Sequence, residues 1–109
     1  MLRIQPVCLD VLRVVRPLAD EIAKFDRDHA RQLRRSSLSV YLNMAEGTGC
    51  RGGTRRARYD DALGSAEETR ANLQAAEAVG YLGALDAELL DWLDRIIRTL
   101  TAIVHKKVA

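Results

Sequence analysis

The spacing of apolar residues along the chain predicts four amphipathic helices. Apolar side chains recur every three or four positions over long stretches, which is the spacing of one face of an α-helix. The helices are predicted at about 6–24, 28–46, 55–79 and 86–106. Short turns join them, so the pattern predicts an all-α protein: an up-down-up-down antiparallel four-helix bundle, with residues 1–109 as a single domain.

Several residues have the properties expected at helix ends. Three fit the N-cap position, where a short polar side chain accepts a backbone N–H: Asp28, Thr54 and Asp86. Gly47 and Gly80 fit the position just after the second and third helices. Pro17 lies inside the first helix, where it removes a backbone donor. It predicts either a kink near residues 13–17 or two abutting helices.

Two features predict close packing beyond an ordinary bundle. On the second helix, Leu38, Leu42 and Ala45 widen the apolar stripe, so we expect a partner outside its own bundle. On the third helix, Gly64 and Ser65 interrupt the stripe with small side chains. Glycine inside a helix costs roughly 1 kcal/mol relative to alanine, so we expect another backbone to approach closely there.

Charge is segregated along the chain although the net charge is only +2. Residues 27–58 carry eight arginines against two acids, a net charge of +6. Residues 60–94 carry one arginine against nine acids, a net charge of −8, and residues 95–109 return to +4. Arginine outnumbers lysine 14 to 3, and its planar fork suits phosphates and carboxylates. The codon preference of a GC-rich genome is an alternative explanation for the arginines.

The basic residues of the second helix and the following turn form the candidate nucleic-acid-binding site: Arg34, Arg35, Arg51, Arg55, Arg56 and Arg58. The first two lie toward the opposite end of the bundle from the other four, about 15 to 30 Å away, so we expect a stripe rather than a pocket. Such a stripe can follow a nucleic-acid backbone. The alternative is a solvated face whose arginines pair with acids of the third and fourth helices.

Enzyme and cofactor chemistry find little support in the sequence. The stretch "EGTGCRGGTRR" lacks the lysine of a phosphate-binding P-loop and follows a helix instead of a strand. Glu46 lacks a catalytic partner and is expected to pair with Arg58. The cysteines and histidines are isolated, so no cofactor and no metal site are predicted. No signal peptide and no membrane-length apolar run are found, and we expect a cytoplasmic protein with no membrane partner.

Residues 31–82 resemble a known family. Matches to its pattern follow one another in order: Leu33-Arg34-Arg35, Ser39, Asn43, Ala45-Glu46-Gly47, Ala62, Gly64-Ser65, Glu68 and Gly80-Tyr81-Leu82. The pattern is similar to that of the four-helix-bundle proteins encoded in intervening sequences of large-subunit ribosomal RNA. Ser36 and the pair Tyr41-Leu42 depart from it. The resemblance supports a structural role for five residues: Asn43, Glu46, Gly47, Gly64 and Ser65.

The resemblance also implies an assembly and partners. It implies a homo-oligomer, in particular a pentamer, without enzymatic activity. The family is similar in turn to the accessory variability determinant proteins of diversity-generating retroelements, which bind a reverse transcriptase and nucleic acid. The leading hypothesis is therefore an oligomer that binds RNA or RNA–DNA through backbone contacts. The alternative is an interaction scaffold that binds a partner enzyme, such as a reverse transcriptase, without touching nucleic acid.

Overall fold

The first helix, α1, spans Gln5–Ala23 in a computed structural model that describes residues 2–106. Pro6 occupies its first turn, where the missing N–H has no helical partner to lose. The helix continues through Pro17 as one element, so two abutting helices do not occur. Pro17 lies on the exposed side, where water can satisfy the carbonyl that loses its donor.

The second helix, α2, spans Arg27–Thr48 and is longer at both ends than the sequence predicts. Its N-cap is Asp26 and not Asp28: the Asp26 carboxylate accepts the backbone N–H of His29 at 2.9 Å. Asp28 instead lies in the first turn, where a negative charge favours the helix dipole. Gly47 does not stop the helix either. It is a buried helical residue, and the C-cap is Gly49.

The third helix, α3, spans Gly52–Ala78, so it begins before the predicted N-cap Thr54. The N-cap is Arg51, whose side chain makes no capping bond. At the other end the predicted stop at Gly80 is confirmed, with φ at +83°. The Gly80 and Tyr81 amides donate to the carbonyls of Glu77 at 3.1 Å and Ala76 at 2.8 Å. This pair of bonds is a Schellman motif, which needs the left-handed residue that glycine supplies.

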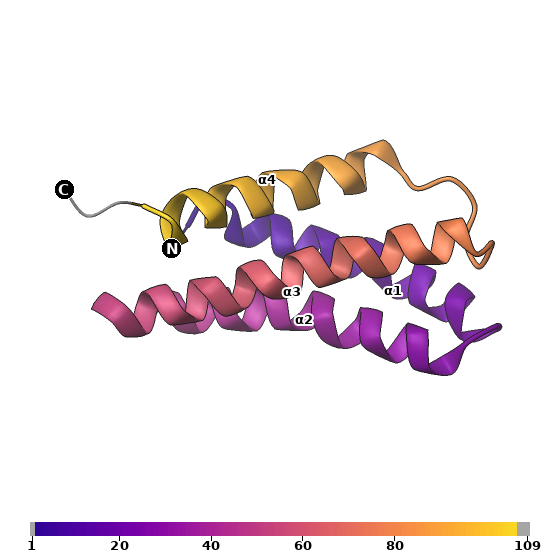
Figure 1. Ribbon diagram of the computed structural model, residues 1–109, viewed down its shortest axis with the longest axis horizontal. Coiled ribbons are helices and arrows are strands. Elements are labelled where there is room, and N and C mark those ends of the chain that lie inside the picture. Colours follow the sequence, from indigo (N-terminus) through magenta and orange to yellow (C-terminus); the bar gives the residue numbers. More distant parts are fainter. Residues whose placement is uncertain (1, 107–109) are drawn as a thin grey trace.

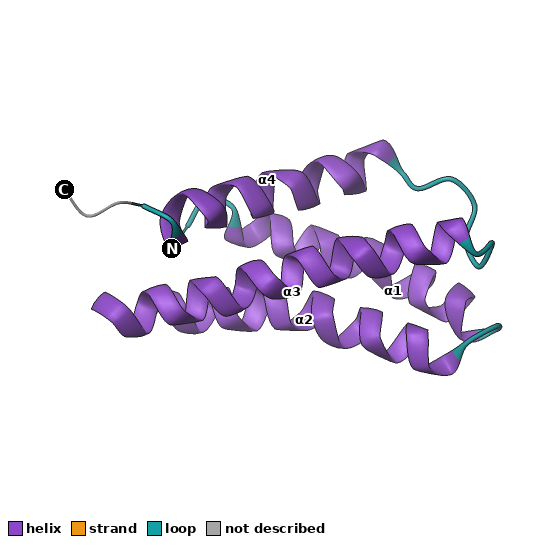
Figure 2. Ribbon diagram, viewed as in Figure 1, coloured by secondary structure: helices purple, strands orange, loops and turns teal. Residues whose placement is uncertain are grey.

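The fourth helix, α4, spans Ala87–Val104, and Asp86 caps it by accepting the Leu89 N–H at 3.4 Å, as predicted. Figures 1 and 2 show the four helices side by side in antiparallel order, with loops only at the two ends. The described chain measures 47 × 21 × 19 Å. The predicted all-α four-helix bundle is confirmed. Each helix packs on its sequence neighbours, and α4 closes the ring on α1.

The core is aliphatic, and α3 contributes unusually small side chains to it. Ala62, Ala66 and Ala76 are completely buried, so α3 can lie close to both α2 and α4. On α4 the buried stripe is larger: Leu89, Leu93, Ile96 and Leu100. Burying one such side chain contributes roughly 1.5–3 kcal/mol. The core therefore holds the turn between α2 and α3 at one end of a stable rod.

Candidate nucleic-acid interface

The turn between α2 and α3 brings four predicted arginines together at one end of the bundle, but it uses them differently. Arg55 caps α2. Its Nε donates to the carbonyl of Cys50 at 2.7 Å and that of Gly47 at 3.2 Å, and its Nη2 to that of Thr48 at 3.4 Å. The Gly47 carbonyl also accepts the Cys50 N–H at 3.1 Å, and a cation at this end of α2 favours the helix dipole. Arg55 is thus an architectural residue of the turn.

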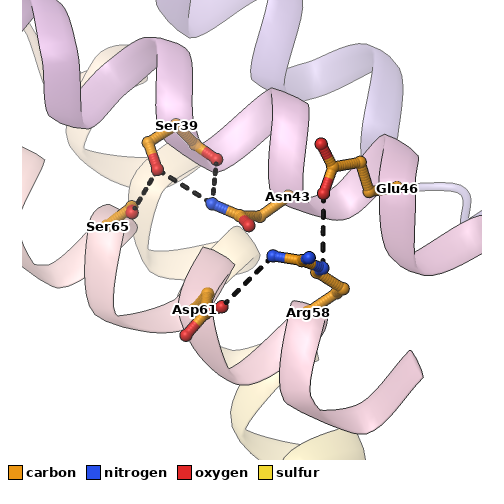
Figure 3. Close-up of polar contacts among 6 residues, drawn as sticks. All are labelled: Ser39, Asn43, Glu46, Arg58, Asp61 and Ser65. Atoms are coloured by element: carbon orange, nitrogen blue, oxygen red, sulfur yellow. Dashed lines mark hydrogen bonds and ion pairs between the residues drawn. The ribbon is translucent and has the colours of Figure 1, made fainter. Parts of the chain in front are cut away.

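Arg58 is also engaged within the chain, as Figure 3 shows. Its Nε lies 3.3 Å from a carboxylate oxygen of Glu46, and its Nη1 lies 3.9 Å from Asp61. The ion pair expected between Glu46 and Arg58 is confirmed. All three side chains are substantially exposed, so the pairs contribute at most about 1 kcal/mol each to stability. They do neutralise much of the charge of Arg58.

Arg51 and Arg56 are the two arginines of this turn that stay available. Both are exposed, and neither has an ion-pair partner among residues 2–106. Arg51 immediately precedes α3, whose first turn contains no acid and whose N-cap makes no side-chain bond. The amides of that first turn can therefore donate to an anion, and the helix dipole favours one there.

Arg34 and Arg35 do not join this turn into one basic stripe. The Arg34 guanidinium donates to Asp20 of α1 at 2.8 Å, whereas Arg35 lines a pocket between α2 and α3. About 17 Å of helix rise separates Arg35 from Glu46, the partner of Arg58. The other expectation, pairing with acids of the third and fourth helices, holds only for Arg58 with Asp61. The six arginines thus divide into separate groups.

A row of polar side chains joins α2 to α3, and we call it the hydroxyl seam: Ser36, Ser39, Asn43, Ser65 and Thr69. Ser65 donates to the Ser39 hydroxyl at 2.9 Å, and Thr69 approaches the Ser36 hydroxyl at the same distance. The Asn43 amide donates to the carbonyl and hydroxyl of Ser39 at 3.0 and 2.9 Å (Figure 3). These bonds satisfy polar groups between packed helices, and the structural roles predicted for Asn43 and Ser65 would depend on them.

Gly47 lets α2 and α3 meet at the end of the seam. A Cβ built on Gly47 would lie 2.5 Å from Cε1 and 2.7 Å from Cδ1 of Tyr59. The Tyr59 ring is itself buried, so it has little room to move. The close approach expected at Gly64 is wrong within the chain: Gly64 is exposed, and a Cβ there would have no neighbour within 4 Å.

The apolar stripe of α2 extends past the bundle, as its width predicts. Leu38 and Leu42, one turn apart, are 47% and 48% exposed. The bundle itself buries the other side of the helix, including Leu33, Val40 and Met44. Two adjacent exposed leucines on one helix form an apolar patch of the kind found at contact surfaces.

Three further features bear on function in residues 2–106: potential metal ligands, thiols and the length of apolar stretches. Within residues 2–106 no group of three His, Cys, Asp or Glu side chains could hold a metal ion. Burial raises the pKa of the Cys8 thiol to about 12, so this cysteine stays protonated and inert. Cys50 is a free, half-buried thiol in the α2–α3 turn. None of the four helices has a stretch long and apolar enough to span a bilayer.

The four packed helices place this protein in the class of all-α four-helix bundles. Residues 8–102 match the model of the family described as 23S rRNA-intervening sequence protein. The chain belongs to this family, and the resemblance found in the sequence is confirmed.

A solved structure supports the same fold. The chain is similar to a protein of unknown function from the S23 ribosomal protein family of Bacteroides thetaiotaomicron, known from a crystal structure. The TM-score is 0.79 at 17% identity, over 94% of this chain and 99% of that one. No curated protein matches this chain.

Proposed function

We propose that this protein is a non-enzymatic, oligomeric nucleic-acid-binding protein that contacts the backbone of RNA or an RNA–DNA hybrid. The observation that carries the proposal is that Arg51 and Arg56 lie at the start of α3, where the N-cap makes no side-chain bond. Both arginines are exposed, and neither has an ion pair in residues 2–106. Two cations beside free backbone amides favour phosphate oxygens. Arg55 and Arg58 then shape the turn, and Arg34 and Arg35 contribute less.

The binding test uses the double variant Arg51→Gln/Arg56→Gln and a matched control, Arg16→Gln/Arg27→Gln. The control removes two exposed arginines that likewise have no ion pair within the described chain. Fluorescence anisotropy with mixed-sequence duplex RNA and an RNA–DNA hybrid is measured over a salt series. The site variant should bind more weakly, with the log–log salt slope reduced by roughly two, because each arginine neutralises one phosphate. Equal slopes in the two variants would rule out this site.

Oligomerisation is part of the proposal, and the exposed leucines of α2 support it. Copies joined through Leu38 and Leu42 would repeat the arginines of the turn around one assembly, which multiplies weak phosphate contacts. A pentamer is the state implied by the family resemblance. Native mass spectrometry should show a discrete oligomer that Leu38→Glu dissociates, because the charge would be buried in an apolar contact. A wild-type monomer at micromolar concentration would contradict the proposal.

The same leucines favour a second candidate, an interaction scaffold whose partner is a protein such as a reverse transcriptase. An exposed apolar patch is the surface expected for a protein contact. Pull-down with the product of a neighbouring gene, before and after nuclease treatment, separates the candidates. Binding that survives nuclease and is lost in Leu38→Glu favours the scaffold. Binding that disappears with nuclease favours the nucleic-acid-binding protein.

A further inference from the structure

A second basic site lies at the same end of the bundle as the α2–α3 turn, but on another face. The N-terminal segment runs beside the last turns of α4 (Figure 1). Between them is a pocket of about 360 Å³ lined by six residues: Leu2, Arg3, Ile4, Arg95, Arg98 and Thr99. Three of the six are arginines, and Ile4 belongs to the apolar core beneath them.

Within residues 2–106 the arginines of this pocket are not ion-paired, although Asp91 and Asp94 lie one helical turn before Arg95 and Arg98. Asp94 precedes Arg98 by one helical turn, a spacing that usually gives a pair, but it binds Arg70 of α3 at 3.0 Å. On α1, Asp10 is likewise engaged, by Arg13 at 3.0 Å.

The start of α1 adds to the positive potential of the pocket. Arg3 lies two residues before the start of this helix, whose first turn contains no acidic residue. The N-cap is the apolar Ile4, which makes no side-chain capping bond. The positive end of the α1 dipole therefore adds to the guanidinium charges and to the hydroxyl donor of Thr99.

We propose that this pocket binds a phosphate monoester: the terminal phosphate of a nucleic-acid strand or free phosphate. Three guanidiniums and a hydroxyl suit a group with several acceptor oxygens and about two negative charges, as a monoester has at neutral pH. An internal phosphodiester carries one charge and needs fewer partners. Where the source is a strand end the inference rests on the proposed function, and Leu2 and Ile4 provide an apolar wall for its last nucleoside.

The test uses Arg95→Gln/Arg98→Gln, with Arg16→Gln/Arg27→Gln as the charge-matched control. One arm measures inorganic phosphate binding by isothermal titration calorimetry. The other compares short RNAs with a 5′-phosphate or a 5′-hydroxyl by anisotropy. Because the variant removes charge-assisted hydrogen bonds, we expect it to bind the monoester roughly tenfold more weakly, with the control unchanged. Arg3→Gln, on a different segment, should weaken binding in the same direction.

The outcomes separate the sources and the two proposals. Preference for the 5′-phosphate that only the site variants lose identifies a strand end. Inorganic phosphate binding with no such preference identifies free phosphate. Absence of both, or binding that Arg95→Gln/Arg98→Gln does not alter, overturns the pocket. The proposed function is tested separately: it fails if 5′-hydroxyl RNA does not bind, or if Arg51→Gln/Arg56→Gln does not weaken that binding.

Discussion

Substituting Gly47 by alanine tests whether α2 and α3 are as close as the structure indicates. The added methyl group would lie 2.5 Å from Tyr59 Cε1, far inside ordinary carbon–carbon contact, and 3.3 Å from Cβ of Arg58. Neither atom can move easily: Tyr59 is 5% exposed, and the Cβ of Arg58 is fixed to the α3 backbone. Overpacking of this kind costs about 1–3 kcal/mol, because the helices must separate locally.

The gain in helix propensity opposes the cost of overpacking, and the variant Gly64→Ala measures this gain alone. Alanine is better than glycine inside a helix by up to about 1 kcal/mol, and both glycines are helical. A Cβ at Gly64 meets nothing within 4 Å, so Gly64→Ala should raise the free energy of unfolding by up to that amount. The free energy of unfolding of Gly47→Ala should be about 1–3 kcal/mol lower than that of Gly64→Ala. At roughly 4 °C per kcal/mol, the two melting temperatures differ by several degrees.

Urea and thermal unfolding followed by circular dichroism measure both variants at one protein concentration. Equal stability of Gly47→Ala and Gly64→Ala would refute the close contact. A Tyr59→Ala background provides the second control, since removing the ring should abolish most of the extra cost of Gly47→Ala. If Gly64→Ala alone lowers both stability and oligomer mass, the close approach expected at Gly64 occurs between subunits.

Two further predictions concern the turn and the core. Arg55→Ala should lower the free energy of unfolding by about 1 kcal/mol in urea titrations, because it removes the guanidinium that donates to the carbonyls of Gly47, Thr48 and Cys50. Arg56→Ala, which removes no such donor, should leave it unchanged. Folding raises the pKa of Cys8 from 9.0 to about 12, so thiolate forms first in the unfolded chain. The contribution of Cys8 is complete below pH 9 and disappears toward pH 12. Wild type should therefore lose about 1.4 kcal/mol more per pH unit above pH 9 than Cys8→Ala, and equal slopes would contradict the shift. A thiol reagent should label Cys50 in the native protein and Cys8 only on unfolding.

The apolar period predicted the fold because a bundle needs little else. Burial of its apolar stripe stabilises each helix, and the midpoints of the predicted helices agree with those observed. The helix ends agreed with the prediction where the capping residue has no other role in packing, as at Asp86 and Gly80. At Gly47 the same residue type served tertiary packing and not termination, and no local pattern distinguishes the two uses. Tertiary contact decided that helix end.

The candidate site was less predictable because charge in a sequence does not reveal its partners. Arg55 and Arg56 are adjacent and chemically identical, yet one caps α2 and the other is exposed without an ion pair in residues 2–106. The pocket around Arg95 and Arg98 was missed for a related reason. The third arginine of the pocket, Arg3, is far from them in the sequence, and it lies beside α4 only because α1 packs against α4. The +4 charge of residues 95–109 was the available signal, although Lys107 lies outside the described residues.

The exposed face of α2 links the fold to the function proposed for it. An isolated bundle leaves Leu38 and Leu42 47% and 48% exposed, so much of their apolar surface stays in water. If copies assemble through these leucines, the apolar area leaves water at about 25 cal/mol per Å². Such an assembly would bring together Arg51 and Arg56 of several chains, so that several phosphate contacts are held at fixed spacing. Under the proposed function, the exposed leucines of α2 and the arginines beside α3 would therefore act in one assembly, and Leu38→Glu should weaken RNA binding without removing a positive charge.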